Sequence, residues 1–110
     1  MIEIKQLKGQ KNYQEVSKLM NDHIQKMSEN EKEEEIWFLE HQNVFTAGSS
    51  TPKEFKKDEI NKIPVIKVNR GGKITFHGPG QLVIYPLINL KKRKKNIIDY
   101  INSLEDICIK

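Results

Sequence analysis

One segment of the sequence concentrates residue types that are used in binding and catalysis. Residues 70–81 read RGGKITFHGPGQ and hold four of the six glycines in the chain. Glycine lets a ligand approach the main chain and adopts backbone conformations closed to other residues. Arg70 can bind an anion or a carbonyl oxygen, Thr75 and Gln81 can form hydrogen bonds, and His77 can donate, accept or carry a proton. Composition alone leaves open whether this is a ligand-binding loop or a hairpin with glycine-rich turns.

The glycine pattern differs from that of a nucleotide phosphate loop. A Walker A loop needs Gly-Lys followed by Ser or Thr, and the dinucleotide fingerprint needs Gly-x-Gly-x-x-Gly. Neither pattern occurs in the sequence. Cys108 is the single cysteine, which excludes an internal disulfide and a cysteine-rich metal site and fits a reducing compartment.

Hydrophobic periodicity predicts the elements that must position this segment. Asn12 can cap a helix that runs to about Ser28, because apolar residues follow it at spacings of three and four. His23 lies at the flank of that apolar stripe, so we expect it to be exposed or partly buried. Asn96 can cap a second helix, with Asp99 near its positive end. Short apolar or alternating runs predict strands at residues 2–7, 36–39, 44–46, 63–68, 73–76 and 81–90.

Size and composition limit the class of protein. The chain has 110 residues, of which 36% are hydrophobic and 31% charged, and its mean hydropathy is -0.67. These values predict one modest globular unit, and a compact monomer of this mass exposes roughly 6,300 Å². No apolar run approaches the ~18 residues of a membrane span, and the first residues resemble neither a signal nor a transit peptide. We therefore expect a cytoplasmic protein that does not bind membranes.

Charge is distributed unevenly along the chain. Residues 1–55 carry a net charge of -3 and residues 56–110 carry +7, within a total of +4. The acidic run at 29–35 is expected to be a solvated loop. The basic run KKRKK at 91–95 is a solvated loop, a nucleic-acid patch or a docking patch for an acidic protein. Nucleic acid is the weakest of the three, since no base-stacking aromatic or known binding motif accompanies the run.

Residues 70–90 resemble the signature of the octanoyltransferases, also called lipoate-protein ligase B, whose pattern runs RGG-x-x-T-[YF]-HGPGQ-x-x-x-YP. The upstream segment LEHQNVFTAG resembles the family's LEHPPVYT-x-G, with Gln42 and Asn43 in place of the prolines. The related ATP-using lipoate ligases carry a different glycine loop, so the resemblance implies no ATP, and we expect no metal or other cofactor. The positions that match in the two segments are Glu40, His41, Val44, Thr46, Gly48, Arg70, Gly71, Gly72, Thr75, Phe76, His77, Gly78, Pro79, Gly80, Gln81, Tyr85 and Pro86.

The resemblance implies that residues 1–110 are the amino-terminal portion of a single biotin/lipoate ligase-like catalytic domain. Its fold class is α/β (α+β), with a mixed sheet and flanking helices. Such enzymes transfer octanoyl from octanoyl-acyl carrier protein, through a cysteine thioester, to a lysine of the lipoyl domains of 2-oxo-acid dehydrogenases and the glycine cleavage system. The residues that align with the family's acyl-substrate-binding loop are Arg70, Gly71, Gly72, Lys73, Ile74, Thr75, Phe76 and His77. The supporting motif comprises Gly78, Pro79, Gly80, Gln81, Tyr85 and Pro86.

The resemblance places no catalytic residue within these 110 residues. The family's nucleophilic cysteine and its activating lysine belong to the carboxy-terminal half of the domain. Cys108 lies on the apolar face of the second predicted helix, where Ile107 and Ile109 offer nothing that activates a thiolate. Lys73 occupies a variable position of the motif and is a poor candidate for the activating lysine.

The second predicted helix has no stop signal after its apolar stripe, so the chain looks truncated. One hypothesis is an amino-terminal part that is active when another chain supplies the rest. The other is a non-catalytic remnant that at most binds acyl carrier protein or lipoyl domains, acidic partners that the basic half suits. Either hypothesis predicts exposed apolar surface around Ile101, Leu104 and Cys108.

Overall fold

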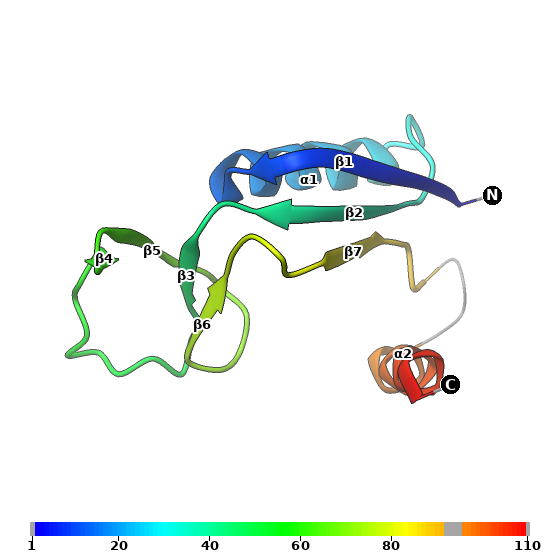
Figure 1. Ribbon diagram of the computed structural model, residues 1–110. Coiled ribbons are helices and arrows are strands. Elements are labelled where there is room, and N and C mark those ends of the chain that lie inside the picture. Colours follow the sequence, from blue (N-terminus) through cyan, green and yellow to red (C-terminus); the bar gives the residue numbers. More distant parts are fainter. Residues whose placement is uncertain (1, 92–95, 110) are drawn as a thin grey trace.

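The computed structural model describes residues 2–91 and 96–109, and the side chains of residues 97 and 107–109 lie outside that description. Two small sheets and two helices make up this part of the chain (Figure 1). No helix in the described ranges is long and apolar enough to cross a membrane. In chain order, the elements are β1 (Glu3–Lys11), α1 (Tyr13–Ser28), β2 (Glu35–His41), β3 (Val44–Ala47), β4 (Glu59–Ile60), β5 (Ile63–Lys67), β6 (Ile74–His77), β7 (Val83–Leu87) and α2 (Ile97–Ile109).

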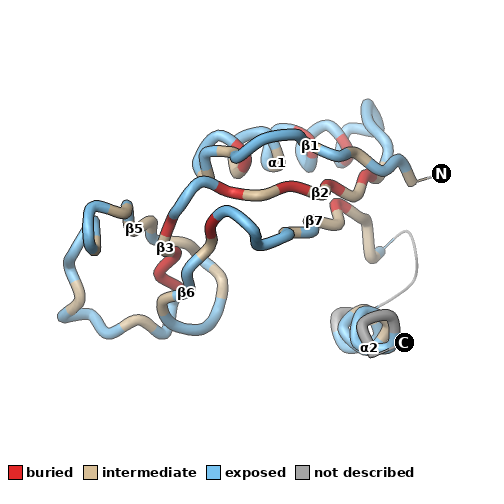
Figure 2. The backbone as a smooth tube through the Cα atoms, viewed as in Figure 1, coloured by how far each residue is buried: buried red, intermediate tan, exposed pale blue. Residues whose placement is uncertain are grey.

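The first sheet has the strand order β1-β2-β7 and carries the hydrophobic core. β1 and β2 are parallel and are joined through α1, the crossover connection that parallel neighbours require. β7 pairs with β2 in the antiparallel direction. Alternate residues of β2 face α1, where Trp37 and Leu39 pack with Val16, Met27 and Leu87. Figure 2 shows this burial concentrated along β2 and on one side of α1.

The second sheet has the strand order β4-β5-β3-β6 and mixes parallel with antiparallel pairs. The chain enters it from β2 to β3 and leaves it from β6 to β7, so it passes between the two sheets twice (Figure 1). Residues 42–43 make the first passage and residues 78–82 the second. The two segments that resemble the family pattern therefore meet at the junction of the sheets.

The structure is less compact than the composition predicted. Its accessible surface is 8560 Å², against the roughly 6,300 Å² expected of a compact monomer of this mass. The radius of gyration is 15.5 Å, whereas a compact domain of this length has a value of about 13 Å. α2 lies apart from both sheets in Figure 1, and its Ile101 and Leu104 are exposed, as expected. The side chain of Cys108 and the basic residues 92–95 lie outside the described residues.

The structure corrects two sequence expectations about side chains. Glu35 ends the acidic run that was expected to be a solvated loop, but it lies in β2 with 5% of its surface accessible. Its carboxylate is held there by Lys5 and by the indole of Trp37. His23 was expected to be exposed or partly buried, but only 4% of its surface is accessible. Its ring packs edge-on against Trp37 with 5.9 Å between centroids. One ring nitrogen, Nε2, lies 2.9 Å from the carbonyl oxygen of Glu33 and must therefore donate its hydrogen. The helical pattern placed His23 at a flank but gave no sign of this loop carbonyl.

Candidate active site

Three interactions join the two motif segments at the junction of the sheets. The amide of Gly80 donates a hydrogen bond of 2.7 Å to Oε1 of Glu40. The hydroxyl of Tyr85 lies 2.8 Å from Nε2 of His41. The rings of His41 and His77 are 6.2 Å apart. Glu40 and His41, which we call the EH segment, thus contact the HGPGQ segment (residues 77–81) directly, although about 35 residues separate the two along the chain.

His41 is the buried centre of this junction, with no accessible surface. Its Nδ1 lies 3.3 Å from the carbonyl oxygen of Lys11, so Nδ1 carries the hydrogen and donates. Nε2 of the neutral ring then accepts from the Tyr85 hydroxyl. Burial lowers the pKa of His41 and raises the pKa of Tyr85 to about 12, so both groups stay neutral near pH 7. This pair fixes geometry rather than carrying charge.

His77 points its hydrogen-bonding groups in defined directions. Its Nδ1 lies 2.9 Å from the side-chain oxygen Oε1 of Gln81, which can only accept, so Nδ1 of the ring donates. In the neutral ring Nε2 is then an acceptor for a ligand. The ring is half-buried at the end of β6. His77 can therefore orient a donor group of a substrate.

The turn after His77 leaves no room for a side chain at Gly78. A β-carbon at Gly78 would lie 2.6 Å from Oδ1 of Asn43 and 2.7 Å from Cζ of Phe76. Such distances are far below van der Waals contact, so any larger residue must displace the side chains of Asn43 and Phe76. Asn43, which replaces a proline of the family pattern, thus packs directly on the motif. In the sequence, nothing else marks Asn43 as a neighbour of the motif.

Arg70 braces the start of the glycine loop. Its Nη2 donates to the carbonyl oxygen of Thr46 at 2.8 Å and to Oγ1 of the same residue at 2.7 Å. Its Nη1 donates to the carbonyl oxygen of Gly71 at 2.7 Å. The guanidinium is thereby committed to protein oxygens of β3 and of its own loop. A direct contact of Arg70 with substrate stays a prediction.

Carbonyl groups anchor the glycine loop to the segment that follows β3. The carbonyl oxygens of Arg70, Gly72 and Lys73 accept from the amides of residues 49, 50 and 48 at 2.9, 2.9 and 3.1 Å. The loop thus turns its acceptors toward the residues 48–50. Beyond it, Ile74 is half-buried in β6, and Thr75 and Phe76 are exposed. The Phe76 ring packs edge-on against Phe45 at 5.3 Å.

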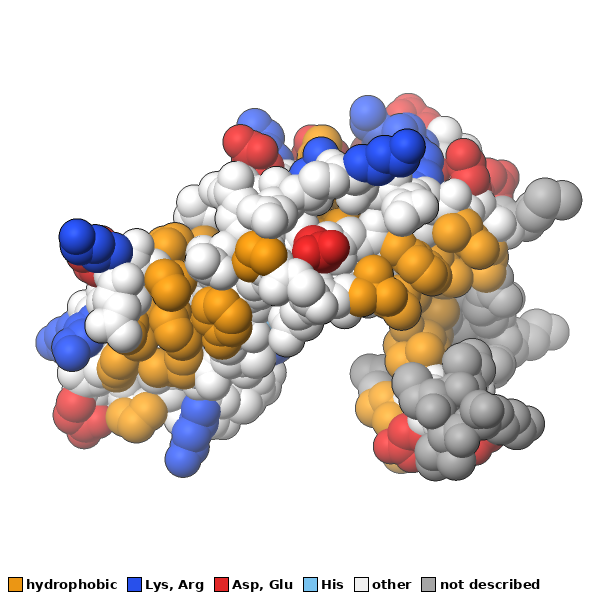
Figure 3. Space-filling view, in the orientation of Figure 1, with side chains coloured by type: hydrophobic (Ala, Val, Ile, Leu, Met, Phe, Trp, Pro, Cys, Tyr) orange, Lys and Arg blue, Asp and Glu red, His pale blue; other side chains and the backbone are white. Residues whose placement is uncertain are grey.

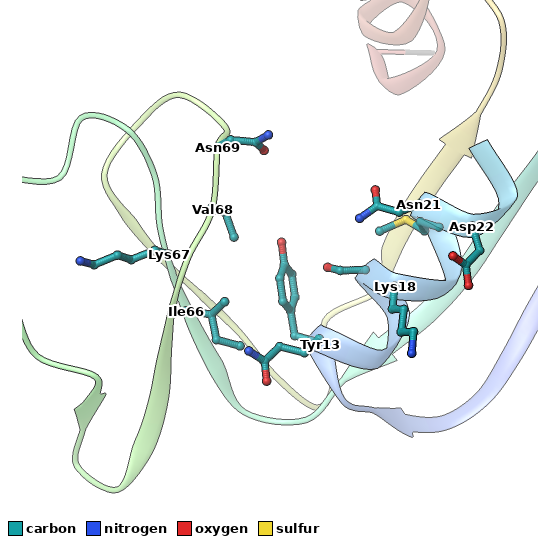
Figure 4. A pocket seen from close by; sticks show the side chains of 11 residues that line it. Tyr13, Lys18, Asn21, Asp22, Ile66, Lys67, Val68 and Asn69 are labelled. Carbon is teal, nitrogen blue, oxygen red and sulfur yellow. The ribbon is translucent and has the colours of Figure 1, made fainter. Parts of the chain in front are cut away.

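A cavity of about 800 Å³ opens beside the junction, between α1 and the segment before the glycine loop. Figure 4 shows Tyr13 standing between the start of α1 and residues 66–69. The Tyr13 ring also contacts His41, with 5.1 Å between centroids. Tyr13 is one of the apolar residues that follow Asn12 in the helical pattern, and nothing in that pattern indicates that it reaches the motif.

Comparison with known proteins identifies similar sequences. Residues 12–110 match the family described as lipoyl protein ligase A/B catalytic domain. The octanoyltransferase of Rickettsia conorii is 46% identical over 99 residues, which cover 86% of this chain and 46% of the relative. That of Rickettsia prowazekii is 41% identical over 111 residues, covering 96% and 51%, respectively. That of Buchnera aphidicola is 51% identical over 78 residues, covering 69% and 36%. The chain spans about half the length of the curated relatives it matches.

Proposed function

Because this chain belongs to the lipoyl protein ligase A/B catalytic domain family, we propose that it is the amino-terminal part of an octanoyltransferase. The observation that carries the proposal is the junction of the EH and HGPGQ segments, held by Glu40, His41 and Tyr85. The substrates are octanoyl-acyl carrier protein and a lysine of lipoyl domains in 2-oxo-acid dehydrogenases and the glycine cleavage system. The relatives named octanoyltransferase support the acyl group and the reaction class.

Residues 70–77 bind the acyl substrate in this proposal. The carbonyl groups of the loop are directed to residues 48–50, which supports a role for its amides toward the opposite side. Amides fixed in this way can stabilise the negative charge that develops on a thioester oxygen during acyl transfer. Arg70 acts through the loop, since its guanidinium holds Thr46 and Gly71. His77 presents Nε2 to a donor on the substrate.

The acyl transfer proceeds in two steps, acylation of the enzyme and transfer to the lysine. A cysteine thiolate of the enzyme attacks the octanoyl carbonyl, and the thiolate of the carrier protein leaves. The lysine amine then attacks the new thioester, the enzyme thiolate leaves, and the amine gives up a proton as the amide forms. In our proposal the cysteine and the lysine that lowers its pKa lie outside these 110 residues. Cys108 takes no part in either step.

A single-chain fusion tests this proposal. Residues 1–110 are joined to the part of the Rickettsia conorii octanoyltransferase that the match leaves out, and the fusion is mixed with octanoyl-acyl carrier protein and apo lipoyl domain. Intact-mass spectrometry should show an octanoylated lipoyl domain and an acyl adduct on the fused part. His77→Ala should lower the transfer rate about tenfold or more, because it removes an oriented acceptor. Cys108→Ser should leave the rate unchanged.

Two outcomes would contradict the proposal. An octanoyl adduct on Cys108 that discharges to the lipoyl domain would place the nucleophile within residues 1–110. A folded fusion that binds the carrier protein without transferring octanoyl would favour the alternative function, a non-catalytic remnant that binds carrier protein or lipoyl domains. The net charge of +7 on residues 56–110 is the observation that favours this alternative, because it suits acidic partners.

A further inference from the structure

The sheet β1-β2-β7 has two apolar faces, and the described residues cover only one. Strand residues alternate between faces, so Trp37 and Leu39 of β2 point toward α1 while Ile36 and Phe38 point away. Trp37 and Leu39 belong to the buried core. Ile36 and Phe38 are only half-buried. A strand with apolar residues on both faces is typical of a sheet that is covered on both sides.

The register of the strands extends this second face across the whole sheet. Ile36 lies between Ile4 of β1 and Pro86 of β7, and Phe38 lies opposite Ile84 of β7. Paired residues share a face, so these five apolar side chains form one surface, which we call the open face. Ile4 is 67% exposed and Ile84 50% exposed. Two large aliphatic side chains, one on each outer strand of the sheet, are thus left exposed to water.

Further apolar surface continues beyond the open face. Leu82, in the turn before β7, is 62% exposed, and Phe76 of β6 is also exposed. Figure 3 shows hydrophobic side chains gathered on the same side of the molecule, one group over the second sheet and another below β2 and β7. Within the described residues, β7 and β6 are also edge strands of their sheets. An open edge beside apolar surface favours addition of further structure.

The amount of surplus surface corresponds to a large interface. The accessible area exceeds that of a compact monomer of this mass by about 2,300 Å². A stable interface of standard size buries only about 800 Å² on each partner. α2, which lies apart from both sheets, contributes to this surplus together with the open face. The surplus as a whole is larger than a transient docking patch requires.

We infer that the open face is the docking surface for the carboxy-terminal half of an octanoyltransferase catalytic domain. This inference rests on the proposed function. The chain spans only 46% of the Rickettsia conorii relative and 51% of the Rickettsia prowazekii relative, so the unmatched half is large enough to cover the face. Glu40 lies on the same face of β2 as Phe38 and holds Gly80 of the motif. A half domain seated here therefore lies next to the glycine-rich turn.

An association experiment tests the inference. The chain of residues 1–110 is co-expressed with a tagged polypeptide that comprises the unmatched part of the Rickettsia conorii octanoyltransferase. Size-exclusion chromatography with light scattering should show a 1:1 complex. Ile84→Asp and Leu82→Asp should each weaken the association about tenfold or more, because a carboxylate would be buried in an apolar interface. Leu82 lies outside the strand, so its variant leaves the pairing of β7 intact.

Leu19 provides the matched control. It is 55% exposed, similar to Ile84, but it lies on α1, which covers the other face of the sheet. Leu19→Asp should change the affinity by less than about twofold. Circular dichroism of each variant checks that the chain stays folded.

Two results would overturn the inference. One is a monomeric chain that does not co-purify with the partner. The other is a homodimer of the chain that Ile84→Asp dissociates, because a second copy would then be the occupant. The association is measured without acyl substrate, whereas the function is measured on the single-chain fusion. An active fusion with halves that do not associate overturns only this inference, and a stable complex beside an inactive fusion overturns only the proposed function.

Discussion

The guanidinium of Arg70 acts as a fork that ties β3 to the glycine loop. It reaches two oxygens of Thr46 and the carbonyl oxygen of Gly71. Lysine keeps the charge but cannot make this planar set of contacts. Arg70→Lys should therefore loosen the loop, and hydrogen exchange at the amides of Ser49 and Ser50 should become about tenfold faster, since these amides donate to carbonyl oxygens of the same loop.

Lys67→Arg is the control for this exchange measurement. Lys67 is an exposed residue at the end of β5. Lys67→Arg exchanges the same two residue types as Arg70→Lys, in the opposite direction. Exchange at Ser49 and Ser50 should stay at its original rate in that variant. Unchanged exchange in Arg70→Lys as well would show that the carbonyl bonds hold the loop without the guanidinium.

Individual site residues were predictable only where a motif names them. The RGG and HGPGQ glycines, His77 and Arg70 stand out by type and spacing, and the family pattern adds His41. No motif names Tyr13 or Asn43, because Tyr13 belongs to a helical pattern and Asn43 departs from the family pattern at a proline. Both reach the motif through contacts that depend on how the two sheets meet.

The helix α1 begins directly after Asn12, whose side chain accepts a hydrogen bond from a free amide of the first turn. Oδ1 of Asn12 accepts from the amide of Glu15 at 3.1 Å. Asn12→Ala should lower the free energy of unfolding by about 1 kcal/mol, as is usual when a helix loses its cap. Urea unfolding followed by circular dichroism measures this change.

Asn21 offers the matched control for the cap. It is an exposed asparagine in the interior of α1, where alanine has the higher helix propensity. Asn21→Ala should leave the free energy of unfolding unchanged or raise it slightly. An equal loss of stability in both variants would mean that the cap contributes nothing specific.

The sequence predicted helices better than strand bounds. Both helices begin at predicted caps, with Asn96 accepting from the amide of Asp99 at 2.8 Å. β1, however, continues to Lys11, past the predicted end at residue 7, because the register shifts between Gln6 and Gln10 and Gly9 adopts a φ of 82° there. β7 is shorter than the predicted 81–90, since pairing with β2 begins only at Val83. Bulges and pairing partners are properties of the sheet, which local patterns do not report.

At the scale of the whole molecule, composition failed to predict compactness. It fixes how much apolar surface a chain of this mass could bury, but not whether the chain contains the element that covers each face. The apolar run IWFL in β2 serves two faces, and α1 covers one of them. The uncovered second face and the separate α2 both contribute to the high accessible surface. The run alone predicted a strand. Only the position of α1 shows which alternate residues of β2 are left uncovered.

Two buried titratable groups make the stability of the chain depend on pH. Burial lowers the pKa of His41. For Glu35, burial alone would raise the pKa. The hydrogen bond from Trp37 and the interactions with Lys5 and His23 lower the pKa by more than burial raises it, so the pKa of Glu35 lies below its ordinary value. Glu35 accepts from Trp37 at 2.9 Å and lies 3.2 Å from Lys5. Both shifts disfavour protonation in the folded state.

The consequence for stability has the same sign for both groups but a different pH range. Below about pH 6.5 the unfolded chain takes up a proton at His41 more readily than the folded chain, so stability falls as the pH falls through this range. The contribution of Glu35 is full above its unfolded pKa and is lost as pH falls through its lower folded pKa. Between pH 7.5 and 5.5 the chain should therefore lose stability, mostly below about pH 6.5, because the buried His41 resists protonation in the folded state.

Urea unfolding at pH 7.5 and 5.5 measures this loss in three chains. His41→Gln should show a shallower pH dependence, because glutamine can donate to the Lys11 carbonyl and accept from Tyr85 but does not titrate. Tyr85→Phe should lower stability by about 1 kcal/mol at both pH values, since it removes one buried hydrogen bond, and should keep a pH dependence. If the dependence were as steep in His41→Gln as in the original chain, the protons would be taken up elsewhere and the buried His41 would not govern the acid side of the stability curve.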